Sequence, residues 1–270
     1  MGSIEVAAGL EAVEPARPVA PYVGGKRNLA ARLAERIATV PHTLYAEPFV
    51  GMGGVFFRRR WRPKAEVIND ISADVVTLFR LLQRHPHAFL DELKWTLSSR
   101  AEFERLMQVD PDTLTDIERA GRFLYLQRLA FGGKVVGRNF GVSRTAGGRF
   151  DITRLRSMLE DVHERLAGVV IERMHWADFL RRYDAPGTLF YLDPPYWGSA
   201  DYYGPTFSHA DYEAMRGALE ALEGRWIMSI NDVPDIRVIF AGCAIEEAGH
   251  HFRLGGRPSE ARELIISRLG

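Results

Sequence analysis

Apolar, strand-like segments alternate with helix-like segments along much of this chain, and this alternation most limits the folds open to it. Thr43–Phe49 is a short apolar strand, and a helix-like segment, Val55–Arg60, follows it after a glycine turn. Glu66–Asn69 is a second strand, and Ala73–Arg84 has apolar residues at helical spacing behind Ser72, a residue type that caps helices. Strand, helix, strand, helix in this order predicts a parallel sheet with right-handed crossovers.

The alternation fails near the middle of the chain and then returns. Between about Ser98 and Phe150 a helix is expected at Asp116–Leu129, followed by a stretch rich in glycine and arginine. Later helices are expected at Leu155–Leu166, at Asp178–Tyr183, and from the capping residue Ser208 to Leu222. Later strands are expected at Val169–Glu172, Gly187–Leu192, Trp226–Ile230, Ala244–Glu247 and Glu263–Ser267, the last two paired with each other.

These segments predict the domain organisation. We expect one α/β core formed by residues 20–97 and 151–270, interrupted by an insertion over residues 98–150. Residues 1–19, rich in Ala, Glu, Pro and Val, are expected to form a loosely ordered leader. Trp61, Trp95 and Met107 are expected in the hydrophobic core.

Composition excludes several other classes of protein. With 46% apolar and 26% charged residues among 270, the chain is typical of a soluble globular domain. Cys243 is the only cysteine, which excludes an intramolecular disulfide and a cysteine-cluster metal site and fits a reducing cytoplasm. The histidines show no metal-ligand spacing, no apolar run is long enough to span a membrane, and no secretory signal is evident. We therefore expect a cytoplasmic protein without a metal or a membrane contact.

The segment Asp193-Pro194-Pro195-Tyr196 directly follows an expected strand, which places it at the carboxyl edge of the sheet, where open α/β folds bind ligands. The amino group of an aromatic base is a poor nucleophile because its lone pair is delocalised. Asp193 and the carbonyl of Pro194 could accept the amino hydrogens and free that lone pair, while Tyr196 offers a face for stacking an extruded base. Pro195 stiffens the turn. The alternative is a structural turn, with Asp193 as a helix cap and Tyr196 in the core.

A second segment, Glu47-Pro48-Phe49-Val50-Gly51-Met52-Gly53-Gly54, predicts a nucleoside site. Glycines directly after a strand let the backbone approach a ligand closely. Asp70 follows the next strand, where a carboxylate can accept both ribose hydroxyls. Phe56 stands where the dinucleotide pattern requires its third glycine, which argues against a nicotinamide dehydrogenase. The alternative is a plain turn with Asp70 as a helix cap.

Together with a third segment, Tyr22-Val23-Gly24-Gly25-Lys26, these motifs resemble the Dam-type, D12-class DNA adenine N6-methyltransferases of bacteria and phages, from Tyr22 to about Ser267. The resemblance implies a Rossmann-like core that binds S-adenosylmethionine, a target-recognition insertion of helices and hairpins, and double-stranded DNA as the partner. It assigns catalysis to Asp193, Pro194, Pro195 and Tyr196. The cofactor contacts that it implies are Tyr22, Lys26, Glu47, Pro48, Phe49, Gly51, Gly53, Asp70, Ile71, Asp178, Phe179 and Asp193. We expect a monomer.

One segment, which begins inside the insertion, is strongly basic although the whole chain has 35 basic and 35 acidic residues. Nine lysines and arginines lie between Arg119 and Arg156, against the one acid Asp151. Such asymmetry indicates a phosphate-binding face. The expected DNA contacts are Lys134, Arg138, Arg144 and Arg149, while Arg122 and Arg128 are expected to contact the phosphate backbone or to be solvated. Phe131-Gly132-Gly133 and Gly148-Arg149-Phe150-Asp151 loosely resemble motifs of the family's target-recognition region. The recognition sequence does not carry over, because the basic and polar residues between these two motifs differ.

Three alternatives remain at this point. The enzyme could act on N4 of cytosine or on adenine in RNA, since both present the same kind of amino group. The chain could instead be a nucleic-acid-binding protein that keeps the fold without turnover, although the intact Asp193, Pro194 and Tyr196 argue against this. A dehydrogenase is the least favoured, because no proton-transfer residue is evident.

Overall fold

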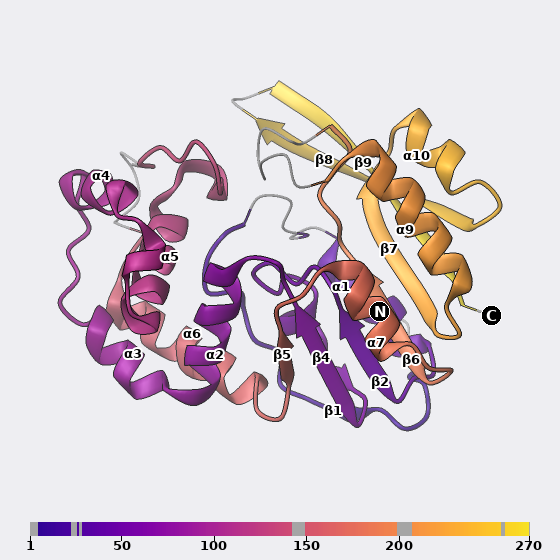
Figure 1. Ribbon diagram of the computed structural model, residues 1–270, viewed down its shortest axis with the longest axis horizontal. Helices are drawn as coiled ribbons and strands as arrows, with labels where there is room; N and C mark the ends of the chain where they lie inside the picture. Colours follow the sequence, from indigo (N-terminus) through magenta and orange to yellow (C-terminus); the bar gives the residue numbers. More distant parts are fainter. Residues whose placement is uncertain are drawn as a thin grey trace.

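A seven-stranded sheet in the order β5-β4-β2-β6-β7-β9-β8 forms the centre of the computed structural model (Figure 1). The structure describes residues 5–22, 26, 29–141, 149–198, 207–254 and 257–269, with the backbone alone over 250–254 and 257–261. The strands are β2 (Leu44–Glu47), β4 (Ala65–Asn69), β5 (Val170–Glu172), β6 (Thr188–Leu192), β7 (Arg225–Asn231), β8 (Ala244–Leu254) and β9 (Arg257–Arg268). The five strands from β5 to β7 in this order are parallel, and β9 is antiparallel to both of its neighbours. The predicted α/β core is confirmed.

Helices cover both faces of the sheet, because alternate strand residues point to opposite sides. One face buries Tyr45 and Ile68 against α1 (Ala30–Thr39), α2 (Ala73–Arg84) and α6 (Ile152–Arg165). The other buries Ala46 and Val67 against α7 (Trp176–Tyr183), α9 (His209–Ala221) and α10 (Pro234–Ile239). Ser72 and Ser208 cap α2 and α9 as predicted.

The middle of the chain forms a helical lobe beside the sheet, at the left of Figure 1. It contains α3 (Pro86–Leu93), α4 (Arg100–Gln108), the short turn η2 (Pro111–Thr113), α5 (Asp116–Leu129) and η3 (Phe131–Gly133). Helix α5 packs against α2, and its Phe123 and Leu126 belong to the hydrophobic cluster that covers the sheet. The expected insertion at 98–150 thus shares the core rather than folding around a core of its own.

Residues 5–19 do not form the loosely ordered leader that the sequence predicts. Strand β1 (Glu11–Ala12) pairs antiparallel with β3 (Trp61–Arg62), and the backbone N–H of Ala16 donates to the carbonyl of Phe57 at 2.8 Å. Val19 is fully buried in the core. An extended segment held by backbone hydrogen bonds needs no hydrophobic periodicity, so its sequence gives little sign of order.

Two further local expectations are wrong. The helix expected at Val55–Arg60 is only the 3-10 turn η1 (Phe56–Arg58), since β3 begins at Trp61. Trp95 is 81% exposed because it lies in the turn after α3, whereas Met107 is half-buried against the core. The predicted pairing of the last two strands is confirmed and extends into a long hairpin at the top right of Figure 1.

In the part of the chain that the structure describes, no helix is long and apolar enough to cross a membrane. The same part contains no group of three or more histidine, cysteine, aspartate and glutamate side chains placed to hold a metal ion.

Candidate functional site

Three candidate acids meet at the carboxyl edge of the sheet. Glu47 ends β2, Asp70 directly follows β4, and Asp193 directly follows β6. Because β4, β2 and β6 are neighbouring parallel strands, their carboxyl ends form one continuous edge. The topology therefore brings the candidate cofactor and catalytic segments together.

The glycine turn after β2 is held by the carboxylate of Asp70. Its Oδ2 accepts a hydrogen bond from the backbone N–H of Gly51 at 2.9 Å, and Oδ1 accepts from that of Ser72 at 2.8 Å. Gly51 and Gly53 adopt φ of 49° and 72°, the left-handed region that glycine tolerates best. A Cβ atom at Gly51 would lie 3.3 Å from the ring of Tyr22, so this ring covers the turn.

Asn69 joins three strand ends around the same turn. Its Nδ2 donates to the carbonyls of Pro48 and Met174 at 2.9 and 3.1 Å, and its Oδ1 accepts from the N–H of Met174 at 2.9 Å. The side chain of Ile71 is 60% exposed directly after Asp70, and Phe49 is half-buried after β2. These positions place a carboxylate acceptor beside apolar surface, as a nucleoside site requires.

Lys26 lies at the centre of a charged cluster with the Asp-Pro-Pro-Tyr segment. Its buried Nζ is 2.9 Å from Oδ1 of Asp193 and 3.2 Å from Oε2 of Glu263, on β9. It also donates to the hydroxyl of Tyr196 at 2.6 Å and lies 4.1 Å from the centre of that ring. The Tyr196 hydroxyl in turn donates to Oε1 of Glu263 at 2.6 Å. The sequence did not single out Glu263 as a site residue.

Burial raises the pKa of two carboxyl groups at this edge, Asp193 in the cluster and Glu47 at the end of β2. It raises the pKa of Asp193 to about 6, and the neighbouring ammonium of Lys26 opposes the rise. It raises the pKa of Glu47 to about 8, although the hydroxyl of Tyr45 donates to Oε2 of Glu47 at 2.6 Å. At neutral pH Asp193 is therefore mostly ionised and Glu47 mostly protonated.

Neighbouring strands and helices fix the backbone of the Asp-Pro-Pro-Tyr segment. The hydroxyl of Tyr212 on α9 donates to the carbonyl of Pro195 at 2.5 Å. The side-chain amide of Asn231, at the end of β7, bonds both to the N–H of Trp197 at 2.9 Å and to its carbonyl at 3.1 Å. Pro194 is buried. The segment is held on both sides, as a preorganised site requires.

A family model described as D12 class N6 adenine-specific DNA methyltransferase matches residues 22–251 of the chain. The protein belongs to this family.

Individual relatives are more distant. The chain is 24% identical over 277 residues to the Type II methyltransferase M1.LlaDCHI of Lactococcus lactis subsp. cremoris. That alignment covers 94% of this chain and 96% of the relative. It is 22% identical over 244 residues to a DNA N-6-adenine-methyltransferase of Escherichia phage P1, covering 85% of this chain but 32% of the phage protein. A solved structure of a proposed RNA methyltransferase of Pyrococcus horikoshii aligns over 94% of this chain and 91% of its own, with 8% identity and a TM-score of 0.41.

Two of the cofactor contacts implied by this D12-class family lie on α7. Asp178 is exposed in the first turn of the helix, where it pairs with Arg181. Phe179 is fully buried in the core, and its backbone N–H donates to the carbonyl of His175 at 3.0 Å. The structure therefore places Asp178 on the surface and Phe179 inside the core, so Phe179 supports α7 by packing and does not line the site.

Several basic residues of the insertion hold its own fold together. Arg119 forms ion pairs with two carboxylates, at 2.6 and 2.7 Å. The buried Arg122 donates from Nε to the carbonyl of Leu106 at 2.8 Å, and Arg128 donates from Nη1 to that of Val19 at 2.5 Å. Both guanidinium groups fix neighbouring backbone segments and are therefore not simply solvated, while the expected phosphate contacts stay a prediction.

The four expected DNA contacts have different environments. Arg138 is half-buried and donates to Oε1 of Gln127 at 3.1 Å and to the carbonyl of Lys134 at 3.2 Å. Lys134 is half-buried and Arg149 is exposed, while Arg144 lies outside the described residues. Arg138 thus stabilises the loop after α5, and Arg149 is the most accessible candidate of the three described.

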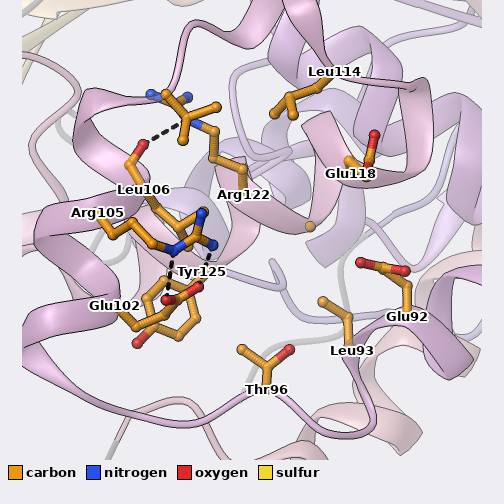
Figure 2. A pocket seen from close by; sticks show the side chains of 12 residues that line it. Glu92, Leu93, Thr96, Glu102, Arg105, Leu106, Leu114, Glu118, Arg122 and Tyr125 are labelled. Atoms are coloured by element: carbon orange, nitrogen blue, oxygen red, sulfur yellow. Dashed lines mark hydrogen bonds and ion pairs between the residues drawn. The ribbon is translucent and has the colours of Figure 1, made fainter.

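A cavity of about 230 Å³ lies between α3, α4 and α5, within the helical lobe (Figure 2). Glu102 and Arg105 pair with each other at its wall, while Arg122 bonds to the carbonyl of Leu106. None of its lining residues belongs to the glycine turn or to the Asp-Pro-Pro-Tyr segment. The cavity is therefore separate from the candidate active site.

Proposed function

We propose that the protein transfers a methyl group to the exocyclic N6 of adenine in double-stranded DNA. The observation that carries this proposal is the position of Asp193, which lies at the sheet edge beside the glycine turn and is bonded to Lys26, itself in contact with Tyr196. The cofactor and the target base would then both lie beside the carboxylate of Asp193. Membership of a DNA adenine methyltransferase family supports the choice of substrate.

The residues at the edge fit S-adenosylmethionine. Each Asp70 oxygen accepts one backbone N–H, which leaves lone pairs for ribose hydroxyls, and exposed Ile71 offers an apolar surface to the adenine. The glycine turn and the ring of Tyr22 would border the sugar and methionine portions. The bound cofactor supplies a methyl group on a sulfonium, whose sulfur keeps the electron pair as the methyl bonds to nitrogen.

The chain itself supplies orientation and electrostatics. Asp193 and the carbonyl of Pro194 accept the hydrogens of the amino group, which directs the nitrogen lone pair toward the methyl group. The ionised carboxylate of Asp193 would also receive the proton that the nitrogen loses. Tyr196 stacks on the adenine after it leaves the helix. The insertion, with Arg149 exposed, would contact the surrounding DNA.

A methyl-transfer assay on unmethylated duplex DNA, followed by mass spectrometry of the nucleosides, tests the proposal. We expect N6-methyladenine with the wild-type protein and no methylated product with Asp193→Ala. N4-methylcytosine as the product would assign the enzyme to cytosine, and a preference for RNA over DNA would replace the proposed substrate. No product of any kind from a protein that binds DNA would indicate the non-catalytic alternative.

A further inference from the structure

Glu263 brings a second carboxylate to the site from outside the Asp-Pro-Pro-Tyr segment. It lies on β9, opposite Asn231 of β7 and Ala248 of β8, and its side chain is 12% exposed. Its Oε1 accepts the hydroxyl of Tyr196, whereas its buried Oε2, near Lys26, has no hydrogen-bond partner among the described groups. One oxygen therefore holds Tyr196, and the carboxylate as a whole brings a second negative charge beside Lys26.

The strand order places this charge near the site of methyl transfer. Asp70 follows β4, where the ribose would bind, and Asp193 follows β6, two positions along the sheet. The sulfur would therefore lie between these strands and the Lys26 cluster that Glu263 joins. In a partly buried site, solvent and salt screen the interaction between charges on neighbouring strands only weakly.

The cluster has more negative than positive charge. The carboxylates of Asp193 and Glu263 surround the single ammonium of Lys26. Glu47 adds no charge near neutral pH, since burial raises its pKa to about 8. The excess of negative charge in the cluster favours binding of a cation beside it. The substrate form of the cofactor has a cationic sulfonium, and the product form has a neutral thioether.

We infer that Glu263 determines cofactor specificity, by making the site bind the sulfonium of S-adenosylmethionine more tightly than the thioether of S-adenosylhomocysteine. This inference rests on the proposed function. The preference weakens binding once the methyl group has left, so the charge that favours the substrate also promotes release of the spent cofactor. Lys26 limits the effect, because its ammonium cancels part of the same charge.

Glu263→Gln isolates the charge, because the amide oxygen still accepts the Tyr196 hydroxyl. Calorimetry with the purified full chain would measure Kd for both cofactor forms. We expect the ratio of Kd for S-adenosylhomocysteine to Kd for S-adenosylmethionine to fall about fivefold or more. Glu247→Gln is the matched control: it removes the same charge from the neighbouring strand, at an exposed position paired with Arg237, and should leave the ratio unchanged.

Lys26→Met tests the inference in the opposite direction and does not depend on the stability of the Glu263 variant. In titrations at a pH that keeps Asp193 ionised, removing the ammonium increases the excess negative charge, so the ratio should rise. Equal weakening of both ligands in Glu263→Gln, or an unchanged ratio in Lys26→Met, would overturn the inference while leaving the proposed function intact. A wild-type protein that binds neither ligand would overturn both.

Discussion

Nε2 of Gln127 donates a hydrogen bond to the carbonyl oxygen of Pro21, 2.8 Å away, and so joins α5 of the insertion to the segment that leads to Tyr22 and Lys26. The same nitrogen donates to the carbonyl of Gly133 at 2.6 Å. The Gln127 side chain is fully buried. One amide therefore fixes the candidate cofactor segment and the loop after α5 relative to each other.

Gln127→Leu should lower both stability and cofactor affinity. The substitution leaves two carbonyls without their partner, at a cost of about 1–3 kcal/mol each in the free energy of unfolding. Gln83→Leu is the matched control, because its Nε2 also donates to two carbonyls, both at 2.8 Å, on the side of α6 and β5. Denaturant titration should show destabilisation in both variants, larger in Gln127→Leu because its Oε1 also accepts from Arg138, and calorimetry should show weaker cofactor binding only in Gln127→Leu. Equal cofactor affinities in the two variants would mean that cofactor binding does not depend on the hydrogen bond between Gln127 and Pro21.

Lys26→Met should move the acid limb of the pH profile of kcat/KM to higher pH. Asp193 must be ionised to accept the amino hydrogens, and burial raises its pKa to about 6 while Lys26 opposes that rise. Activity of the wild-type protein should therefore fall as the pH drops through about 6. Removing the ammonium disfavours the carboxylate, so the midpoint rises, whereas Lys26→Arg keeps the charge and should keep the midpoint. A midpoint that stays in place in Lys26→Met would separate Asp193 from this limb.

The core of the fold could be predicted because its signals are local. Ser72 and the apolar spacing of α2 gave both ends of that helix, and the Asp-Pro-Pro-Tyr segment after β6 marked the edge of the sheet where the candidate site lies. Glu263 could not be identified in this way, because only the antiparallel placement of β9 beside β7 brings it to Lys26. The arginines of the insertion show the opposite error: their number suggested a phosphate-binding face, yet Arg122 is buried against a backbone carbonyl.

Glu47→Gln should stabilise the protein at alkaline pH. The folded state holds a proton on Glu47 up to about pH 8, since burial raises its pKa from 4.5, whereas the unfolded chain loses that proton near its ordinary pKa. Stability therefore falls as the pH rises between these two values, and glutamine removes this dependence. Thermal unfolding measured from pH 5 to about pH 8 should show a gain of a few kcal/mol near the upper limit.

Glu66→Gln provides the comparison, because its buried carboxylate pairs with Arg165 at 2.7 and 2.8 Å. That variant should be destabilised, since it leaves a buried guanidinium without its counter-ion. If Glu47→Gln showed the same pH dependence as the wild type, Glu47 would be ionised in the folded protein.

Arg149→Ala should weaken DNA binding without changing the fold or cofactor affinity. The side chain of Arg149 is exposed, and among the described residues the bond to Arg149 is accepted by its backbone carbonyl, from Nε of Arg128 at 2.8 Å, which alanine preserves. If Arg149 contacts a phosphate, affinity should fall for all sequences and the salt slope should decrease by about one. If it contacts a guanine edge, the loss should be about 1–3 kcal/mol at the cognate site alone. Arg80→Ala, an exposed arginine of α2, is the control and should match the wild type in titrations at several salt concentrations. An Arg149→Ala variant indistinguishable from that control would remove this end of the insertion from the DNA interface.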